Sequence, residues 1–120
     1  MPDELAGAIL SCHPVTFSYT RQALTSAARE VRPHALYESS PGKISLSGVQ
    51  VSGPTSSGPG ALPGWRLFDV AMITDVEVQP GVFEPDPDFR PRSARFGRLI
   101  LDCRHGWAKG AGPDPAGAPP

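Results

Sequence analysis

Hydrophobic and polar residues alternate along much of this chain with the two-residue period of a half-buried β-strand. The alternation is clearest where Val15, Phe17 and Tyr19 fall on one face of a short segment. Five segments predict short strands by alternation or by a short apolar run, at residues 15–19, 29–37, 43–51, 65–78 and 96–103. The fourth contains a strand, a tight corner and a second strand. This succession predicts a mainly β fold, as a small barrel or a strongly curved sheet.

One short helix is predicted before the strands. Asp3 can cap it, and its apolar positions follow the spacing of one helix face, at Leu5, Ala8, Ile9 and Cys12. Pro14 should end the helix, because the residue before a proline is pushed out of the α region.

Prolines and glycines mark the turns of the predicted strands. Residues 39–42 (S-S-P-G) predict a turn, and the polar residues 20–26 predict another. Pro33 places the second strand at an edge or at a bulge, because proline cannot donate to a strand ladder. Gly48 permits a bulge in the third strand.

Fifteen prolines and thirteen glycines argue against long helices. Residues 52–64 and 106–120 are mostly Gly, Pro, Ser and Ala, which bury too little apolar surface to offset the entropy of ordering them. We therefore expect one domain at residues 1–105, with a flexible loop at 52–64 and a disordered tail at 106–120. Trp107, in this tail, is either a last anchor onto the fold or an exposed contact for a partner.

Residues 79–93 hold four prolines. They should run extended over the surface, pinned by Phe83 and Phe89.

The formal net charge of −1 gives no global field that recruits nucleic acid or an anionic membrane, so any attraction must be local. No apolar run approaches the roughly 20 residues that span a bilayer, and the N-terminus lacks a secretory signal pattern. We expect a soluble, cytoplasmic protein that binds no membrane.

Cys12 and Cys103 lie far apart in the sequence, with no spacing that suits zinc, so we expect no metal site. Two reduced, structural thiols are the first interpretation, and a disulfide or a reactive cysteine is the alternative. A nucleophile elbow, a metal-ligand pair and a phosphate-cradling glycine loop are all missing from the sequence. We therefore expect no enzyme and no cofactor.

Arg66 is the charge that the alternation singles out. It lies between Trp65 and Leu67, so in an extended strand it points to the opposite face from both. There its guanidinium can meet an anionic ligand. The alternative is a solvated arginine or an ion pair with Asp69 or Glu77.

Five pieces of sequence, taken in order, resemble the WYL domain family. They are the apolar pattern of residues 8–19, R-E-V-R-P-H-A-L at 29–36, G-K-I-S-L-S-G at 42–48, W-R-L-F-D-V-A-M-I-T-D-V-E-V at 65–78 and F-E-P-D-P-D-F at 83–89. The resemblance covers about residues 5–103 and implies an Sm-like, SH3-type barrel, here five-stranded. It also implies a role in bacterial transcription regulation, with single-stranded nucleic acid or a nucleotide-like molecule as ligand.

Two motifs of that family are altered here. The tripeptide that names it falls on residues 44–46 (I-S-L), so only the leucine is kept. The basic phrase R-x-F-R-x-x-R-I falls on residues 66–73, where Arg66 survives but Asp69 and Met72 replace the other arginines. Each lost cation removes a charge-assisted contact of about 1.5–3 kcal/mol. The fourteen residues before Val15 cannot hold a helix-turn-helix, so we expect no recognition helix of its own.

The resemblance implies ligand contacts at Arg66, Arg29 and Ser45. His34 can add an auxiliary donor that titrates near neutral pH, and the alternative is an ordinary histidine on an edge strand. A second basic segment holds five arginines in 15 residues, and Arg92, Arg95 and Arg98 in it are candidates for gripping a nucleic-acid backbone. The alternative is that these arginines offset the neighbouring acids, which are Glu84, Asp86, Asp88 and Asp102.

Together these features predict a non-enzymatic regulatory module that senses a negatively charged ligand, either single-stranded nucleic acid or a nucleotide. The alternative is a protein-interaction domain that has kept the barrel, lost the ligand pocket and binds a regulatory protein partner. The sequence leaves the oligomeric state open.

Overall fold

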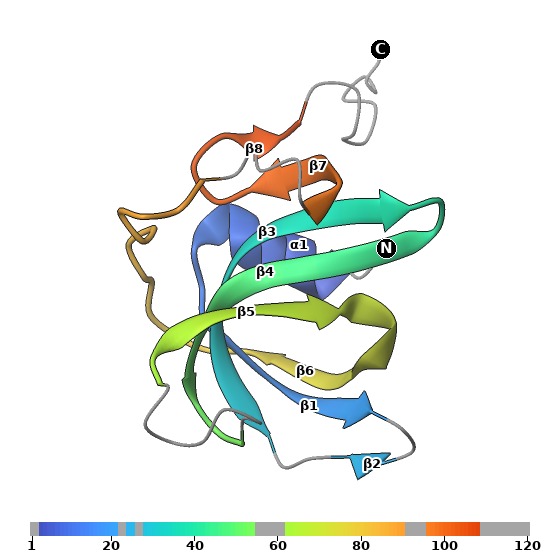
Figure 1. Cartoon of the computed structure of the whole chain (residues 1–120). Helices are drawn as coiled ribbons and strands as arrows, with labels where there is room; N and C mark the ends of the chain where they lie inside the picture. Colours follow the sequence, from blue (N-terminus) through green and yellow to red (C-terminus); the bar gives the residue numbers. More distant parts are fainter. Residues whose placement is uncertain (1–2, 22–23, 26–27, 55–61, 91–95, 109–120) are drawn as a thin grey trace.

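The computed structural model describes residues 3–21, 24–25, 28–54, 62–90 and 96–108 (Figure 1). The fold is mainly β with one short α-helix at its N-terminal end, as predicted. In chain order the elements are α1 (Asp3–Ser11), β1 (Val15–Arg21), β2 (Leu24–Thr25), β3 (Arg29–Ser40), β4 (Lys43–Ser52), β5 (Gly64–Asp69), the 3₁₀ helix η2 (Val70–Met72), β6 (Ile73–Val78), β7 (Arg98–Asp102) and β8 (Gly106–Trp107). The five predicted strand segments and the predicted helix are therefore confirmed.

The strands form an antiparallel, strongly curved sheet with β3 at its centre (Figure 1). One edge of β3 pairs with β4 along most of its length. The other edge pairs first with β1 and then with β7, so β3 links two parts of the sheet. Beyond these strands, β4 pairs with β5, β1 pairs with β6 and β2, and β7 pairs with β8.

The sheet is not closed into a barrel within the described part of the chain. β5 and β6 follow each other through η2, yet they lie at the two ends of the strand order β6-β1-β3-β4-β5 and share no ladder there. The corner separates them: Asp69 caps η2 by accepting a hydrogen bond from the Ala71 amide at 3.0 Å. The predicted five-stranded Sm-like or SH3-type barrel is therefore not confirmed.

The core fills the space between the sheet and α1, which contacts β3, β6 and β7. Phe68 lies at its centre, edge-on to the rings of Phe17 and Tyr19 at centroid distances of 5.1 and 5.2 Å. The Tyr19 hydroxyl also accepts a hydrogen bond from the Asp69 amide at 2.8 Å, which ties the corner to β1. The buried face of α1 consists of Leu5, Ala6, Ala8 and Ile9. Among the described residues, no helix combines the length and apolar character needed to cross a membrane.

A bulge in β3 places His34 outside the regular ladder. Pro33 pairs with Gly48 and Ala35 pairs with Ser47, so His34 is the extra residue on β3. Of the two positions predicted for Pro33, the bulge is therefore observed, and the edge is excluded because β3 is central. β4 carries the predicted bulge, at Val51 rather than at Gly48, because Glu30 pairs with Ser52 and Val31 pairs with Gln50. At Gly48 itself glycine is required by close approach, since a Cβ atom there would lie 2.6 Å from the Arg32 carbonyl oxygen.

Two short strands differ from the sequence prediction. β2 lies in the segment predicted as a turn and pairs with the end of β1. β8 lies in the predicted tail, where it pairs with β7, and Trp107 packs against the core as an anchor. Strand pairing therefore continues to Trp107. Two-residue strands carry no periodicity of their own, so only their partner strands reveal them. Most of the predicted loop, at 55–61, and residues 109–120 of the predicted tail lie outside the described residues.

Candidate ligand pocket

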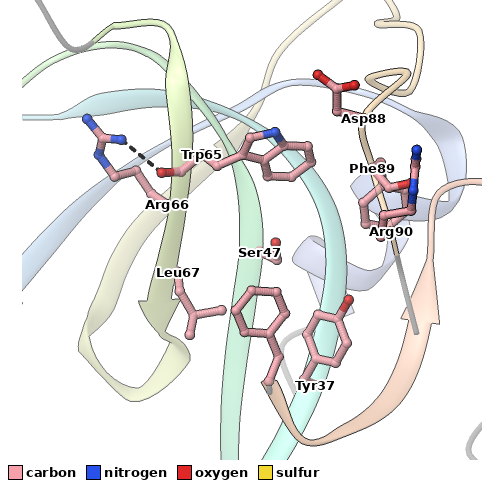
Figure 2. A pocket seen from close by; sticks show the side chains of 9 residues that line it. Tyr37, Ser47, Trp65, Arg66, Leu67, Asp88, Phe89 and Arg90 are labelled. Atoms are coloured by element: carbon pink, nitrogen blue, oxygen red, sulfur yellow. Dashed lines mark hydrogen bonds between the residues drawn. The ribbon is translucent and has the colours of Figure 1, made fainter. Parts of the chain in front are cut away.

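A pocket of about 480 Å³ opens on the face of β3, β4 and β5 that lies opposite the core (Figure 2). Residues 79–90, here called the strap, follow β6 without a helix or strand and reach this face at Asp88, Phe89 and Arg90. The lining is largely aromatic or apolar, and its residues are Tyr37, Ser47, Trp65, Arg66, Leu67, Asp88, Phe89, Arg90 and Phe96. Such a mixture of aromatic walls and a few polar groups is typical of small-ligand sites.

Strand alternation places the walls of the pocket. Phe68 on β5 points into the core, so Trp65 and Leu67 point outward, as Figure 2 shows. Ser47 pairs with Leu67 on the neighbouring strand and lies on the same face. Trp65 and Leu67 stay 38% and 49% exposed, which is unusual for side chains of this size and leaves them available to a ligand.

Two pairs of aromatic rings flank the pocket. Trp65 stacks on Phe89 of the strap, with centroids 5.9 Å apart and an interplanar angle of 17°. Tyr37 contacts Phe96 at 5.4 Å in a tilted arrangement. A planar molecule placed among these rings can stack on at least one of them.

The strap is held against the sheet through His34. The His34 ring is fully buried and contacts Trp65, Phe83 and Phe89 at centroid distances of 4.8, 5.0 and 5.2 Å. Both phenylalanines are buried, so they pin the strap as predicted.

The hydrogen bonds of His34 define its protonation state. The Asp86 amide donates to Nε2 at 3.0 Å, so Nε2 carries no proton. Nδ1 therefore carries it and donates to the Arg32 carbonyl at 2.8 Å. Burial lowers the pKa of His34 below its usual 6.5, and the hydrogen bond to Arg32 only partly opposes this. His34 is thus a neutral structural residue at neutral pH, with both ring nitrogens engaged inside the protein.

Two arginines also fix the strap. Arg104 donates from Nη2 to the Asp86 carbonyl at 2.9 Å, and its guanidinium lies 5.8 Å from the Phe89 ring centroid. Arg90 donates from Nη1 to the carbonyls of Pro87 and Phe89 at 3.1 and 3.0 Å. These contacts place positive charge beside the aromatic walls.

The four ligand contacts predicted from the sequence do not converge on one site. Arg66 borders the pocket, but its guanidinium points away from the Trp65 ring and donates to the Trp65 carbonyl at 2.8 Å (Figure 2). Arg29 lies on the core side of the sheet, with its guanidinium 5.3 Å from the Tyr19 ring centroid. Ser45 is buried on the pocket side of β4, and His34 is buried behind the walls.

The second basic segment is only partly described. Arg92 and Arg95 lie outside the described residues. Arg98 forms a salt bridge with Glu38, and this contact lowers the pKa of the Glu38 carboxyl. For Arg98 this agrees with the alternative in which the arginines offset acids, although Glu38 is not one of the acids expected.

The fold brings the two cysteines together. The Cys12 thiol lies 3.7 Å from the Cys103 carbonyl oxygen, across 91 residues of sequence, and both cysteines are free. Burial, together with the nearby Cys12, raises the pKa of Cys103 to about 12, so this thiol is protonated at neutral pH.

The sequence interpretation missed the aromatic pocket. It used Trp65 and Leu67 only to orient Arg66, although the same alternation turns these two side chains away from Phe68. That alternation was the available signal for the pocket. A strand with large apolar residues on both faces must be covered by other residues on both faces or leave one face exposed.

The fold is similar to part of a solved structure, the proteasome accessory factor B/C (PafBC) of Arthrobacter aurescens. The TM-score is 0.58 and the sequence identity is 26%. The match covers 75% of this chain and 13% of the PafBC chain, so the chain spans a small part of that protein's length. No family model matches the sequence, and no curated protein matches it.

Proposed function

We propose that this chain is a WYL-like regulatory domain that binds a planar, negatively charged ligand in the pocket on the outer face of β3–β5. The ligand is a nucleotide or an unpaired base of single-stranded nucleic acid. The observation that carries the proposal is the exposed Trp65, which stacks on Phe89 at the edge of a pocket of about 480 Å³. Stacking of a base on an aromatic side chain contributes about 1–3 kcal/mol.

Charge beside the pocket favours an anionic ligand. A guanidinium has five donors, and the described backbone contacts of Arg90 use only its Nη1 group. A phosphate attached to the stacked base can therefore meet Arg90 from solvent. Arg66 borders the pocket and donates to the Trp65 carbonyl at 2.8 Å, so its positive charge adds to that of Arg90. The Asp88 carboxylate lines the strap side of the pocket, and its negative charge disfavours a second phosphate there.

A regulatory role is supported by two similarities. The sequence resembles the WYL family in five ordered segments, and the fold is similar to part of PafBC, a regulator that contains a WYL domain. Both similarities favour regulation over catalysis. The WYL resemblance implies an Sm-like barrel, and in this chain such a barrel would be open between β5 and β6.

The proposal is tested by fluorescence anisotropy of short labelled single-stranded DNA and RNA, at low and at physiological salt. Trp65→Ala should weaken binding about 5- to 150-fold, which corresponds to the loss of one stacking contact of about 1–3 kcal/mol. Trp107→Phe is the matched control, since Trp107 is the other tryptophan of the chain and packs against the core. Arg90→Ala should reduce the slope of log affinity against log salt concentration by about 1, the amount expected for one phosphate contact.

Nucleotides can be tested through Trp65 itself. In a Trp107→Phe background Trp65 is the remaining tryptophan, so AMP or another mononucleotide stacked on it should quench its emission. Unchanged emission at millimolar nucleotide, together with no oligonucleotide binding at low salt, would refute the proposal.

A protein-interaction domain is the second candidate. Its support is the pair of exposed apolar side chains, Trp65 and Leu67, and the replacement of family arginines by Asp69 and Met72. This candidate predicts that neither nucleotides nor oligonucleotides bind at any salt concentration. The two candidates therefore give opposite results in the same experiment.

A further inference from the structure

His34 occupies the point where the sheet, the strap and the pocket meet, although it does not line the pocket. It is the extra residue of the β3 bulge and is fully buried. Its ring contacts Trp65 of β5 at 4.8 Å and Phe89 of the strap at 5.2 Å, and these two rings form one wall of the pocket. A change at His34 therefore reaches the pocket through its walls.

At Asp86 the strap is held by the lone pair of a single ring nitrogen, whereas its earlier part is held by the Phe83 amide, which donates to the Cys12 carbonyl at 2.8 Å. The Asp86 amide donates to His34 Nε2 at 3.0 Å, across 52 residues of sequence. The Asp86 carbonyl is held separately by Arg104 at 2.9 Å. On the sheet side, Nδ1 donates to the Arg32 carbonyl at 2.8 Å, which fixes the orientation of the ring. The imidazole thus bridges two segments by accepting from one and donating to the other.

We propose that His34 is a positioning residue that holds the strap on the sheet at Asp86 only while its ring is neutral, so that acidification releases this part of the strap and weakens ligand binding in the pocket. The effect on binding rests on the function proposed above. The release of the strap does not, because it is a property of the protein without ligand.

Protonation of His34 converts an acceptor into a donor. The new N–H on Nε2 would face the Asp86 N–H, and two donors cannot form a hydrogen bond. It would also bury a positive charge, and groups from three segments decide how costly this is. The Asp86 carboxylate of the strap favours the cation, whereas Arg104 after β7 and Arg32 of β3 oppose it. Burial is the largest effect and also opposes it, which is why the pKa of His34 is lowered.

The direction of the pH effect follows by linkage. In the released state His34 meets water and titrates near its ordinary pKa of about 6.5. In the closed state, in which the Asp86 amide donates to His34 Nε2, the pKa of His34 is lower. The closed state therefore has its full stability advantage over the released state above about pH 6.5, and it loses this advantage as the pH falls through the closed-state pKa. Between these two values, the ratio of released to closed molecules rises up to about tenfold per pH unit.

Hydrogen exchange of the Asp86 amide, followed by NMR in the free protein from pH 7.5 to 5.0, tests the proposal. After correction for intrinsic exchange, Asp86 protection should fall by up to about tenfold per pH unit below about pH 6.5. Amides within the β3–β4 ladder should keep their protection. His34→Gln is the matched variant, because its amide oxygen can accept from the Asp86 amide and does not titrate, so Asp86 should remain protected throughout.

Two results would overturn the proposal. One is wild-type protection at Asp86 that does not change with pH, and the other is an equal fall in His34→Gln. If the Asp86 amide is unprotected in His34→Gln at every pH, the wild-type protein tests the proposal. The fall in its Asp86 protection must then coincide with titration of the His34 ring in the same NMR series. Anisotropy with the labelled single-stranded DNA at pH 7.5 and 5.5 tests the consequence separately. No DNA binding at either pH would refute the proposed function and leave the exchange result standing.

Discussion

Replacing Gly48 with alanine should destabilise the domain, whereas the same replacement at Gly7 should stabilise it. A Cβ atom at Gly48 would lie 2.6 Å from the Arg32 carbonyl oxygen, 2.9 Å from Val31 Cγ1 and 3.2 Å from Pro33 Cα. Two of these atoms belong to the β3 backbone, which cannot rotate away as a side chain can. The ladder between β3 and β4 must therefore open at the bulge that carries His34.

The cost of this overpacking is about 1–3 kcal/mol. A domain of this size is stable by only about 5–15 kcal/mol, so the loss is a substantial fraction of the free energy of unfolding. With a denaturant dependence of about 2 kcal/mol per M in urea, a loss of about 2 kcal/mol lowers the midpoint by about 1 M. Urea unfolding followed by circular dichroism measures this shift directly.

Gly7 provides the control with the opposite sign. It is exposed on α1, and a Cβ there would meet no heavy atom within 4 Å. Alanine in a helix is favoured over glycine by about 0.5–1 kcal/mol, so Gly7→Ala should raise the midpoint by a few tenths of 1 M. A Gly48→Ala protein as stable as the wild type would refute the argument, because β3 would then accommodate a methyl group at no cost.

Three further predictions concern His34, Cys103 and Phe68. Lowering the pH below about 6.5 should reduce the urea midpoint of the wild type more than that of His34→Gln. The pKa of His34 is lowered in the folded state, so protonation of His34 favours unfolding. Parallel pH profiles of the two urea midpoints would contradict this. Cys103, whose pKa is raised to about 12, should resist iodoacetamide at pH 8 in the native protein and react in urea, as read by intact mass, and rapid native labelling would show that burial does not protect it. Phe68→Ala should cost about 3–5 kcal/mol, because Phe68 packs on Phe17 and Tyr19; a urea midpoint within 0.3 M of the wild type, roughly the error of such a measurement, would exclude this central role.

The strands were predictable because their pattern is local. Residues 15–19, 29–37 and 43–51 alternate in polarity, and alternation alone specifies an extended segment with one buried face. The direction of Arg66 relative to Trp65 followed from the same period and agrees with Figure 2. The turn before β4 was also predictable, because Gly42 adopts a φ of +80° there, which favours glycine.

The candidate site was not predictable to the same extent. Sequence reasoning placed His34 among the ligand contacts because a histidine titrates near neutral pH. Its observed position depends on Asp86, which lies 52 residues away, and on the bulge beside Pro33, where the sequence left an edge and a bulge both open. Ser45 and Arg29 were both named as contacts, yet the register of β4 and the packing of Tyr19 place them on opposite sides of the sheet.

The local pattern predicted the five main extended segments, the helix and the residues that share a face within each strand, because these properties depend on neighbours within a few positions. The tertiary structure decided which face became the core. Phe17 and Tyr19 of β1 receive Phe68, and this contact turns Trp65 and Leu67 outward into the pocket. It also decided that the sheet stays open between β5 and β6 and that the strap closes over His34. These outcomes depend on contacts between residues distant in sequence, where many pairings satisfy the same local pattern and packing selects one of them.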